Sequence, residues 1–305
     1  MIKASGLTKV YKDCVALKEF SCEIPQFCIA GLLGANGAGK STAMKILSGC
    51  LAPSSGKASL LGYDILSQSQ EARKQIGYVP ETMFFYRDMI VKEYLEYVGA
   101  LKNVAKNLLR NQIMRIVEEC HLEDVYLKKI GYLSKGYCQR LGLAQALVGD
   151  PPILIVDEPT SSLDPLQIID TRNLLKNLGK KKCILLSTHI LSEVEQICDQ
   201  VIILHRGEIV LQENLYSLLR ANKLLLSLAK NPINLLDKIS QIKGITNIDF
   251  LYENTLQIFF QENFDLYAEI QALCQQYDWP VLYFGYAKTT LEDIYVQATH
   301  TEKVV

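Results

Sequence analysis

The sequence of 305 residues contains no run of about 18 consecutive apolar residues, the length that a helix needs to cross a bilayer, so we expect no membrane span. Its first residues show no charged segment followed by an apolar one, and we therefore expect no secretory leader. The nine cysteines form no C-x-x-C pair, which disfavours a zinc or thioredoxin-like site and favours reduced thiols in a cytosolic protein. Lys+Arg 32 and Asp+Glu 33 leave no excess of either sign, so the overall charge gives no attraction to nucleic acid or anionic lipid.

Two patterns of sequence meet near residue 220. Before it, short apolar runs such as 153–156 and 183–186 alternate with helical segments and glycine-rich turns, as in strands buried on both faces of a parallel sheet. We therefore predict an α/β domain over residues 1–218, with a helical part at about 87–150. After it, the order β-α-β-β-α-β predicts a small α+β accessory domain over 222–299, with the split βαβ plan of ferredoxin-like domains.

A glycine-rich segment carries the clearest chemical signal. It matches G-x-x-x-x-G-K-[ST] after an apolar strand and before a helical run, the context in which this motif binds phosphate. The motif comprises Gly34, Ala35, Asn36, Gly37, Ala38, Gly39, Lys40, Ser41 and Thr42. Its backbone N–H groups can point at phosphate oxygens, Lys40 can reach the β and γ phosphates, and the Ser41 hydroxyl can hold Mg²⁺. The alternative is a glycine-rich turn with an incidental lysine.

Two acidic residues, Asp157 and Glu158, follow the apolar run 153–156. Carboxylates at the carboxyl end of a buried strand lie at the rim where open α/β sheets bind ligands. Asp157 suits Mg²⁺, directly or through water, and Glu158 can polarise the water that attacks the γ phosphate. The alternative is a pair of acids that merely caps a strand at the surface.

Together with further motifs in the expected order, these residues resemble the ATPase subunit of ATP-binding cassette (ABC) transporters. Residues 133–137, Leu-Ser-Lys-Gly-Tyr, are similar to the signature loop, residues 162–164 to the D-loop, and residues 187–189 to the switch-histidine segment. Tyr11 stands where the family stacks an aromatic ring on adenine, although it also reads as a tyrosine on a half-buried strand. The resemblance covers about residues 1–215 and implies a P-loop NTPase cassette with a mixed sheet and a helical subdomain.

The resemblance also implies a mechanism with ATP and Mg²⁺. Two copies would close head to tail over two ATPs, with Ser134 and Gly136 meeting the γ phosphate in trans and Asp164 lining the same interface. It makes Glu158 the general base and His189 the residue that holds the γ phosphate and the attacking water, although a lone histidine at a strand end is more often structural. Docking on a separate transmembrane permease would hold the chain at the cytoplasmic face of the inner membrane as a peripheral subunit.

Three positions depart from the family pattern. Lys135 and Tyr137 replace Gly and Gln of the signature loop, and Glu81 stands where most members have the Q-loop Gln. A carboxylate is still an oxygen ligand for Mg²⁺, so we expect Glu81 to contribute to the metal and nucleotide site and to tune turnover.

Other features of the sequence indicate the branch of the family and the alternative functions. The Leu-Ser-Lys-Gly run and the added C-terminal domain are similar to drug-resistance, natural-product and gliding-motility exporter ATPases. The bulky segment 83–89 would dock a permease helix or simply fill the core. A regulatory or non-transport cassette ATPase without a membrane partner is the alternative function. The short distance in sequence between Lys40 and Asp157 leaves no room for the coiled-coil insertion of chromosome-associated cassettes, and no basic stripe predicts nucleic-acid binding.

Overall fold

The computed structural model describes residues 1–161, 163–219, 223–252, 254–261, 264, 266–287 and 290–300. The chain forms two compact units, one made of Met1–Leu215 with Tyr295–Val305 and the other of Tyr216–Ile294. No helix within the described ranges is long and apolar enough to cross a membrane.

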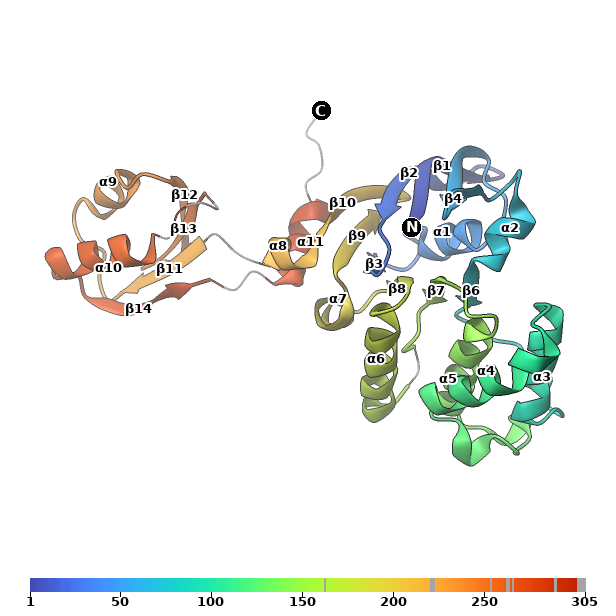
Figure 1. Cartoon of the computed structure of the whole chain (residues 1–305). Helices are drawn as coiled ribbons and strands as arrows, with labels where there is room; N and C mark the ends of the chain where they lie inside the picture. Colours follow the sequence, from blue (N-terminus) through green and yellow to red (C-terminus); the bar gives the residue numbers. More distant parts are fainter. Residues whose placement is uncertain are drawn as a thin grey trace. The chain divides into compact units, whose positions relative to one another are not determined.

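The first unit contains two sheets (Figure 1). One is antiparallel with the order β2-β1-β4-β5, and the other has the order β10-β9-β3-β8-β7-β6 with only the β10–β9 pair antiparallel. The strands of the antiparallel sheet are β1 (Ile2–Tyr11), β2 (Cys14–Ile24), β4 (Ser55–Leu60) and β5 (Tyr63–Asp64). Those of the mixed sheet are β3 (Ile29–Leu33), β6 (Ile76–Val79), β7 (Ile153–Asp157), β8 (Cys183–Thr188), β9 (Gln200–His205) and β10 (Glu208–Asn214).

The main core lies between these sheets and surrounds the first helix. Residues Ala43, Met44, Ile46 and Leu47 share one apolar cluster with both sheets. Strands β7 and β8 are buried along their whole length, as their continuous apolar runs predict. The helices of the first unit that lie with these sheets are α1 (Lys40–Leu47), α2 (Ser69–Lys74), α6 (Pro165–Gly179) and α7 (Leu191–Ile197). Two further helices, α8 (Leu215–Leu219) and α11 (Leu291–His300), each have residues in both units.

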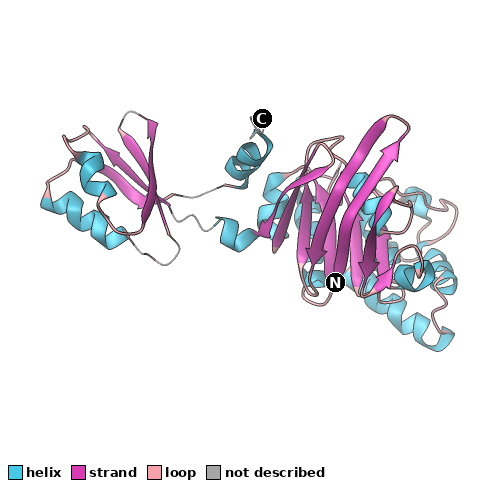
Figure 2. Cartoon of the chain, turned by 90° about the horizontal axis from the view of Figure 1, so that it is seen from above, coloured by secondary structure: helices cyan, strands magenta, loops and turns pink. Residues whose placement is uncertain are grey.

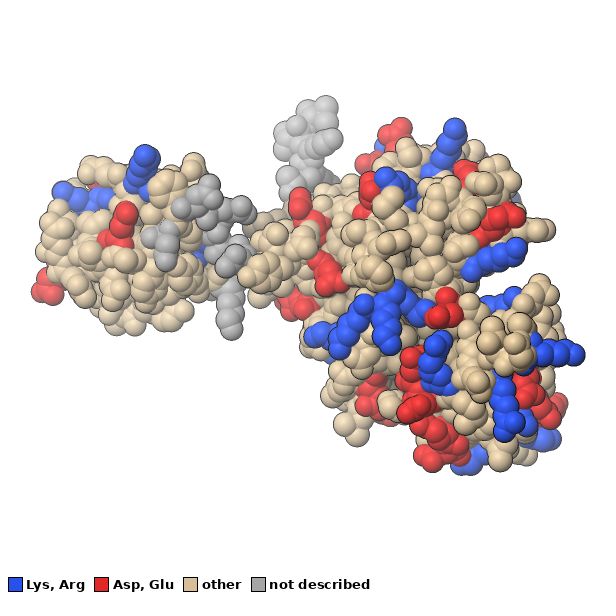
Figure 3. Space-filling model, in the orientation of Figure 1, with Lys and Arg blue, Asp and Glu red and all other residues tan. Residues whose placement is uncertain are grey.

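A helical part is inserted between β6 and β7, within the range that the helical spacing predicts. Its elements are α3 (Val91–Leu101), α4 (Lys106–Glu119), η1 (Glu123–Val125), η2 (Ile130–Tyr132) and α5 (Lys135–Leu147). Helix α5 joins this part to the mixed sheet because it packs closely on β6, where a Cβ on Gly77 would lie 2.3 Å from the carbonyl oxygen of Ala146. On the face drawn in Figure 3, basic and acidic side chains are interspersed over these helices.

The second unit is a sheet covered by two helices. Its elements follow in the predicted order: β11 (Lys223–Leu228), α9 (Leu235–Ser240), β12 (Ile245–Tyr252), β13 (Thr255–Phe260), α10 (Tyr267–Gln276) and β14 (Val281–Tyr286). The strands run in the order β12-β13-β11-β14 with every pair antiparallel. Alternate residues Leu224, Leu226, Leu256 and Ile258 form one core with α9 and α10, and Figure 2 shows both helices on one side of the sheet.

Candidate active site

The glycine-rich loop joins β3 to α1 and has a shape that only glycine allows. Gly37 and Gly39 have φ angles of 80° and 106°, in the left-handed region that favours glycine. A Cβ on Gly39 would lie 2.5 Å from the carbonyl oxygen of Ala16, and one on Gly34 would lie 2.5 Å from that of Leu204. Because the N-cap of α1 is a glycine, no side chain there competes with an anion for the first-turn N–H groups. The loop therefore fits a phosphate group.

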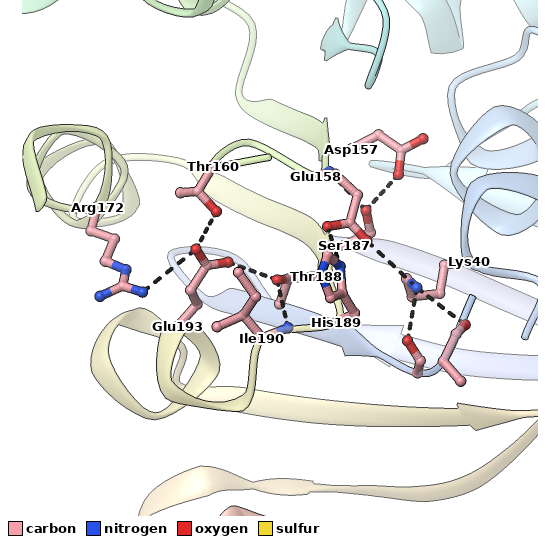
Figure 4. Close-up of polar contacts among 12 residues, drawn as sticks. Lys40, Asp157, Glu158, Thr160, Arg172, Ser187, Thr188, His189, Ile190 and Glu193 are labelled. Carbon is pink, nitrogen blue, oxygen red and sulfur yellow. Dashed lines mark hydrogen bonds and ion pairs between the residues drawn. The ribbon is translucent and has the colours of Figure 1, made fainter. Parts of the chain in front are cut away.

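Lys40, at the start of α1, lies between this loop and the strand-end acids. Only 6% of its side chain is exposed. Its Nζ donates hydrogen bonds to the carbonyl oxygens of Gly34 at 2.8 Å and Ala35 at 3.3 Å, and lies 3.5 Å from Glu158 Oε1 (Figure 4). A buried ammonium needs such partners, and phosphate oxygens can take the place of any of them.

Asp157 and Glu158 face different partners. The Asp157 carboxylate is 2% exposed and accepts a hydrogen bond from the Ser187 hydroxyl on the neighbouring strand β8. Glu158 has a φ of 48°, a left-handed conformation that costs a residue with a Cβ about 1 kcal/mol or more. Its backbone N–H donates to Ser187 Oγ at 3.0 Å.

The side chain of Glu158 is shared between a lysine and a histidine. Oε1 lies 3.5 Å from Lys40 Nζ, while Oε2 lies 2.9 Å from Nδ1 of His189, just beyond the end of β8. Glu158 is 10% exposed and His189 is 49% exposed, so the pair is anchored in the protein and open on the histidine side. The structure thus brings together Lys40, Asp157, Glu158 and His189, four residues singled out in the sequence.

Ser134, Gly136 and Asp164 have local roles, and among the described residues none of the three forms a hydrogen bond or ion pair with Lys40, Asp157, Glu158 or His189. Ser134 caps α5 by accepting a hydrogen bond from the Tyr137 N–H at 3.4 Å, and Asp164 caps α6 by accepting from the Gln167 N–H at 2.9 Å. Gly136 is buried, and a Cβ there would meet the Gln167 side chain at 2.6 Å. Ser162, part of the predicted D-loop, lies outside the described residues.

Tyr11 lies near the glycine-rich loop and Glu81 near the rim of the mixed sheet. Among the described residues, neither contacts the group formed by Lys40, Asp157, Glu158 and His189. Tyr11 ends β1, is 45% exposed and pairs with Cys14, in the same hairpin whose Ala16 contacts Gly39. Glu81 is exposed and follows β6.

Ser41 and Asp157 supply oxygen atoms of the kind that Mg²⁺ prefers. Ser41 belongs to the first turn of α1, and Asp157 ends the strand that leads to Glu158. In the part of the chain that the structure describes, no three His, Cys, Asp or Glu side chains form a metal-binding group. A hydroxyl, one carboxylate and phosphate oxygens fit Mg²⁺ bound with a nucleotide, because this ion rarely uses an all-protein cage.

The bulky segment 83–89 divides between core and surface. Phe85 packs edge-on against Tyr94 with ring centroids 5.4 Å apart, and Met83 lies against Gly142 of α5. Phe84 is 90% exposed and Tyr86 is 59% exposed. Phe85 and Met83 therefore fill the core, Phe84 and Tyr86 lie at the surface, and the docking of a permease helix on this segment stays a prediction.

Sequence reasoning missed the groups that fix the two loops of the site. Ser187 and Thr188 belong to the switch segment, but the motif assigns no contact to either, and Glu193 stands in no motif of the sequence. The available signal was an acidic residue on the apolar face of α7, beside Val194 and four positions after His189.

Comparisons with known proteins agree with this architecture. The ABC transporter family model matches residues 17–161. YxlF of Bacillus subtilis, an uncharacterized ABC transporter ATP-binding protein, is 35% identical over 305 residues, covering 98% of this chain and 100% of that protein. The bacitracin transport ATP-binding protein BcrA of Bacillus licheniformis is 36% identical over 212 residues, covering 69% of this chain and 68% of that protein.

Solved structures give the same result. An ATP-binding subunit of an ABC transporter matches with a TM-score of 0.66 and 29% identity, over 72% of this chain and 92% of that one. An ATP-binding cassette, solved as a dimer in a post-hydrolysis state bound to ADP and Pi, matches with a TM-score of 0.65 and 26% identity, over 70% of this chain and 99% of that one. The chain belongs to the ABC transporter family as an ATP-binding subunit, an ATPase that works with ATP and Mg²⁺.

Proposed function

We propose that this chain drives an exporter, as a dimer of two copies docked on a separate transmembrane permease at the cytoplasmic face of the membrane. Two relatives support export: BcrA, named for bacitracin transport, and the Nod factor export ATP-binding protein I of a Rhizobium species, 35% identical over 207 residues. The dimeric solved cassette supports the paired arrangement. The cargo does not follow from the fold.

Within the site, Glu158 is the general base, and this assignment carries the proposal. Its carboxylate lies between Lys40 and His189, so a phosphate bound by the loop and Lys40 would stand beside the base that activates water. Lys40 neutralises phosphate charge, and His189, open to solvent on one side, holds the γ phosphate and the water. Ser41 and Asp157 would hold the metal ion, which supplies further charge neutralisation when bound.

The remaining predicted residues act at the edges of the nucleotide. Tyr11 would stack on adenine, and Glu81 would reach the metal ion and the terminal phosphate. Ser134, Gly136 and Asp164 would meet the second copy's nucleotide, and the N-terminus of α5 suits an anion because helix N–H groups point outward there.

The exposed aromatic residues Phe84, Tyr86 and Tyr132 are candidates for the permease contact. They are 90%, 59% and 83% exposed. Large exposed aromatic side chains are costly to leave in water and are typical of interaction surfaces.

The test compares Lys40→Met with Lys45→Met, a matched control on the exposed side of the same helix. We expect Lys40→Met to lose Mg·ATP binding, measured by equilibrium titration, and to lose hydrolysis, while Lys45→Met retains both. Equal nucleotide affinity in wild type and Lys40→Met would contradict the assignment of the loop. Co-purification of a polytopic membrane protein with the wild-type chain tests the transport role.

A further inference from the structure

A buried carboxylate joins the two loops that carry Glu158 and His189. Glu193, on α7, is 1% exposed. Its Oε2 accepts a hydrogen bond from the Thr188 hydroxyl at 2.7 Å, and its Oε1 accepts one from the Thr160 hydroxyl (Figure 4). Arg172 of α6 approaches the same Oε1 with Nη2 at 3.5 Å.

These contacts fix the backbone next to both reacting side chains. Thr160 lies two residues after Glu158, and Thr188 lies immediately before His189. The Thr188 hydroxyl oxygen also accepts a hydrogen bond from the Ile190 N–H at 3.0 Å, so the chain is held on both sides of His189. The Glu193 carboxylate thereby links the loop that carries Glu158 to the loop that carries His189.

Stability alone does not explain a charged group at this place. Burying a carboxylate costs several kcal/mol before its partners compensate, and an apolar side chain often packs at no net loss. The neighbouring buried positions of α7 are apolar, Val194 and Ile197. What a carboxylate adds is two acceptor oxygens in one rigid plane, each aimed at a different loop.

We propose that Glu193 is a positioning residue for hydrolysis, which holds Glu158 and His189 at the separation the reaction needs. The proposal rests on the proposed function, because it takes this pair to act on the attacking water and the γ phosphate. Loss of the link lets the two loops move apart and lowers the rate of the chemical step without removing the phosphate-binding loop.

The first experiment measures kcat and KM for ATP in Glu193→Gln, Thr188→Val and Thr160→Val. Glutamine keeps the volume but offers one acceptor oxygen and leaves the charge of Arg172 unbalanced. The valine variants each remove one hydroxyl and keep the shape. We expect each variant to lose about 10- to 100-fold in kcat with KM changed less than about 3-fold. Glu195→Gln on the exposed side of α7 is the matched control and should retain wild-type kinetics.

A double-mutant cycle with His189→Ala separates positioning from general stability. Single-turnover rates with enzyme in excess resolve the slow variants. We expect Glu193→Gln to cause a smaller loss in the His189→Ala background, because without the imidazole the separation between Glu158 and His189 no longer affects the rate. The same loss in both backgrounds, or a loss of affinity in place of kcat, overturns the proposal. The valine variants carry the test if Glu193→Gln does not fold, as judged by its thermal transition. If wild type itself neither binds nor hydrolyses Mg·ATP, the proposed function fails instead.

Discussion

At the scale of single residues, the centre of the site is one carboxylate, that of Glu158, which two other side chains share. Glu158 contacts Lys40 and His189 with separate oxygens, and its left-handed backbone turns it toward them. A residue held in such a conformation is stabilised by its surroundings, here by two hydrogen-bonding atoms of Ser187 on the adjacent strand. The side-chain contacts of Glu158 are therefore made at a cost in the conformational energy of its backbone.

Replacing Glu158 by Gln removes the negative charge and keeps the volume. We expect kcat for ATP hydrolysis to fall by about 10²–10⁴-fold, because the amide cannot accept the proton of the attacking water. Mg·ATP affinity should be retained, since Lys40 loses a competing partner for phosphate. Steady-state phosphate release and equilibrium nucleotide titration measure the two quantities. A kcat within about 2-fold of wild type would remove Glu158 from the base role.

At the scale of helices and strands, sequence patterns predicted much of what the structure contains. The buried strands β7 and β8, the loop between β3 and α1, and the order of elements in the second unit all follow from local patterns with strong physical causes. Contacts between segments that are distant in sequence cannot be predicted from such local patterns. The hydrogen bond from Ser187 to Asp157 depends on the register of two strands about 30 residues apart, and the side-chain pattern of neither strand specifies a partner.

The contact between β6 and α5 gives a prediction at this scale. In Gly77→Ala the new Cβ would lie 2.3 Å from the carbonyl oxygen of Ala146, so the helix must move from the sheet. We expect a loss of about 1–3 kcal/mol in the free energy of unfolding, measured by urea denaturation. Gly285→Ala in β14 is a matched strand control, because its Cβ would first meet the end of a tyrosine side chain. An unchanged denaturation midpoint in Gly77→Ala would contradict the close packing.

At the scale of the whole molecule, each unit has its own apolar core. The core of the first unit surrounds α1, and that of the second joins the sheet to α9 and α10. Cysteines occur in both: Cys22, Cys28, Cys120, Cys183 and Cys198 are buried in the first unit and Cys274 in the second. Thiols thus report on the integrity of both cores at once.

Alkylation at pH 8 should divide the thiols by burial. Burial raises the pKa of the Cys22 and Cys28 thiols to about 12 and that of Cys183 to about 11, so the reactive thiolate of the first two amounts to on the order of 10⁻⁴ of each thiol at that pH. Cys14 and Cys50 are exposed and should react first in the native chain, as followed by mass spectrometry of peptides over time. Urea should release the buried thiols together within each unit, because a cooperative core opens as a whole. Native labelling of Cys22 at the rate of Cys14 would show that the first unit's sheets open readily, and equal labelling of Cys274 would show the same for the second.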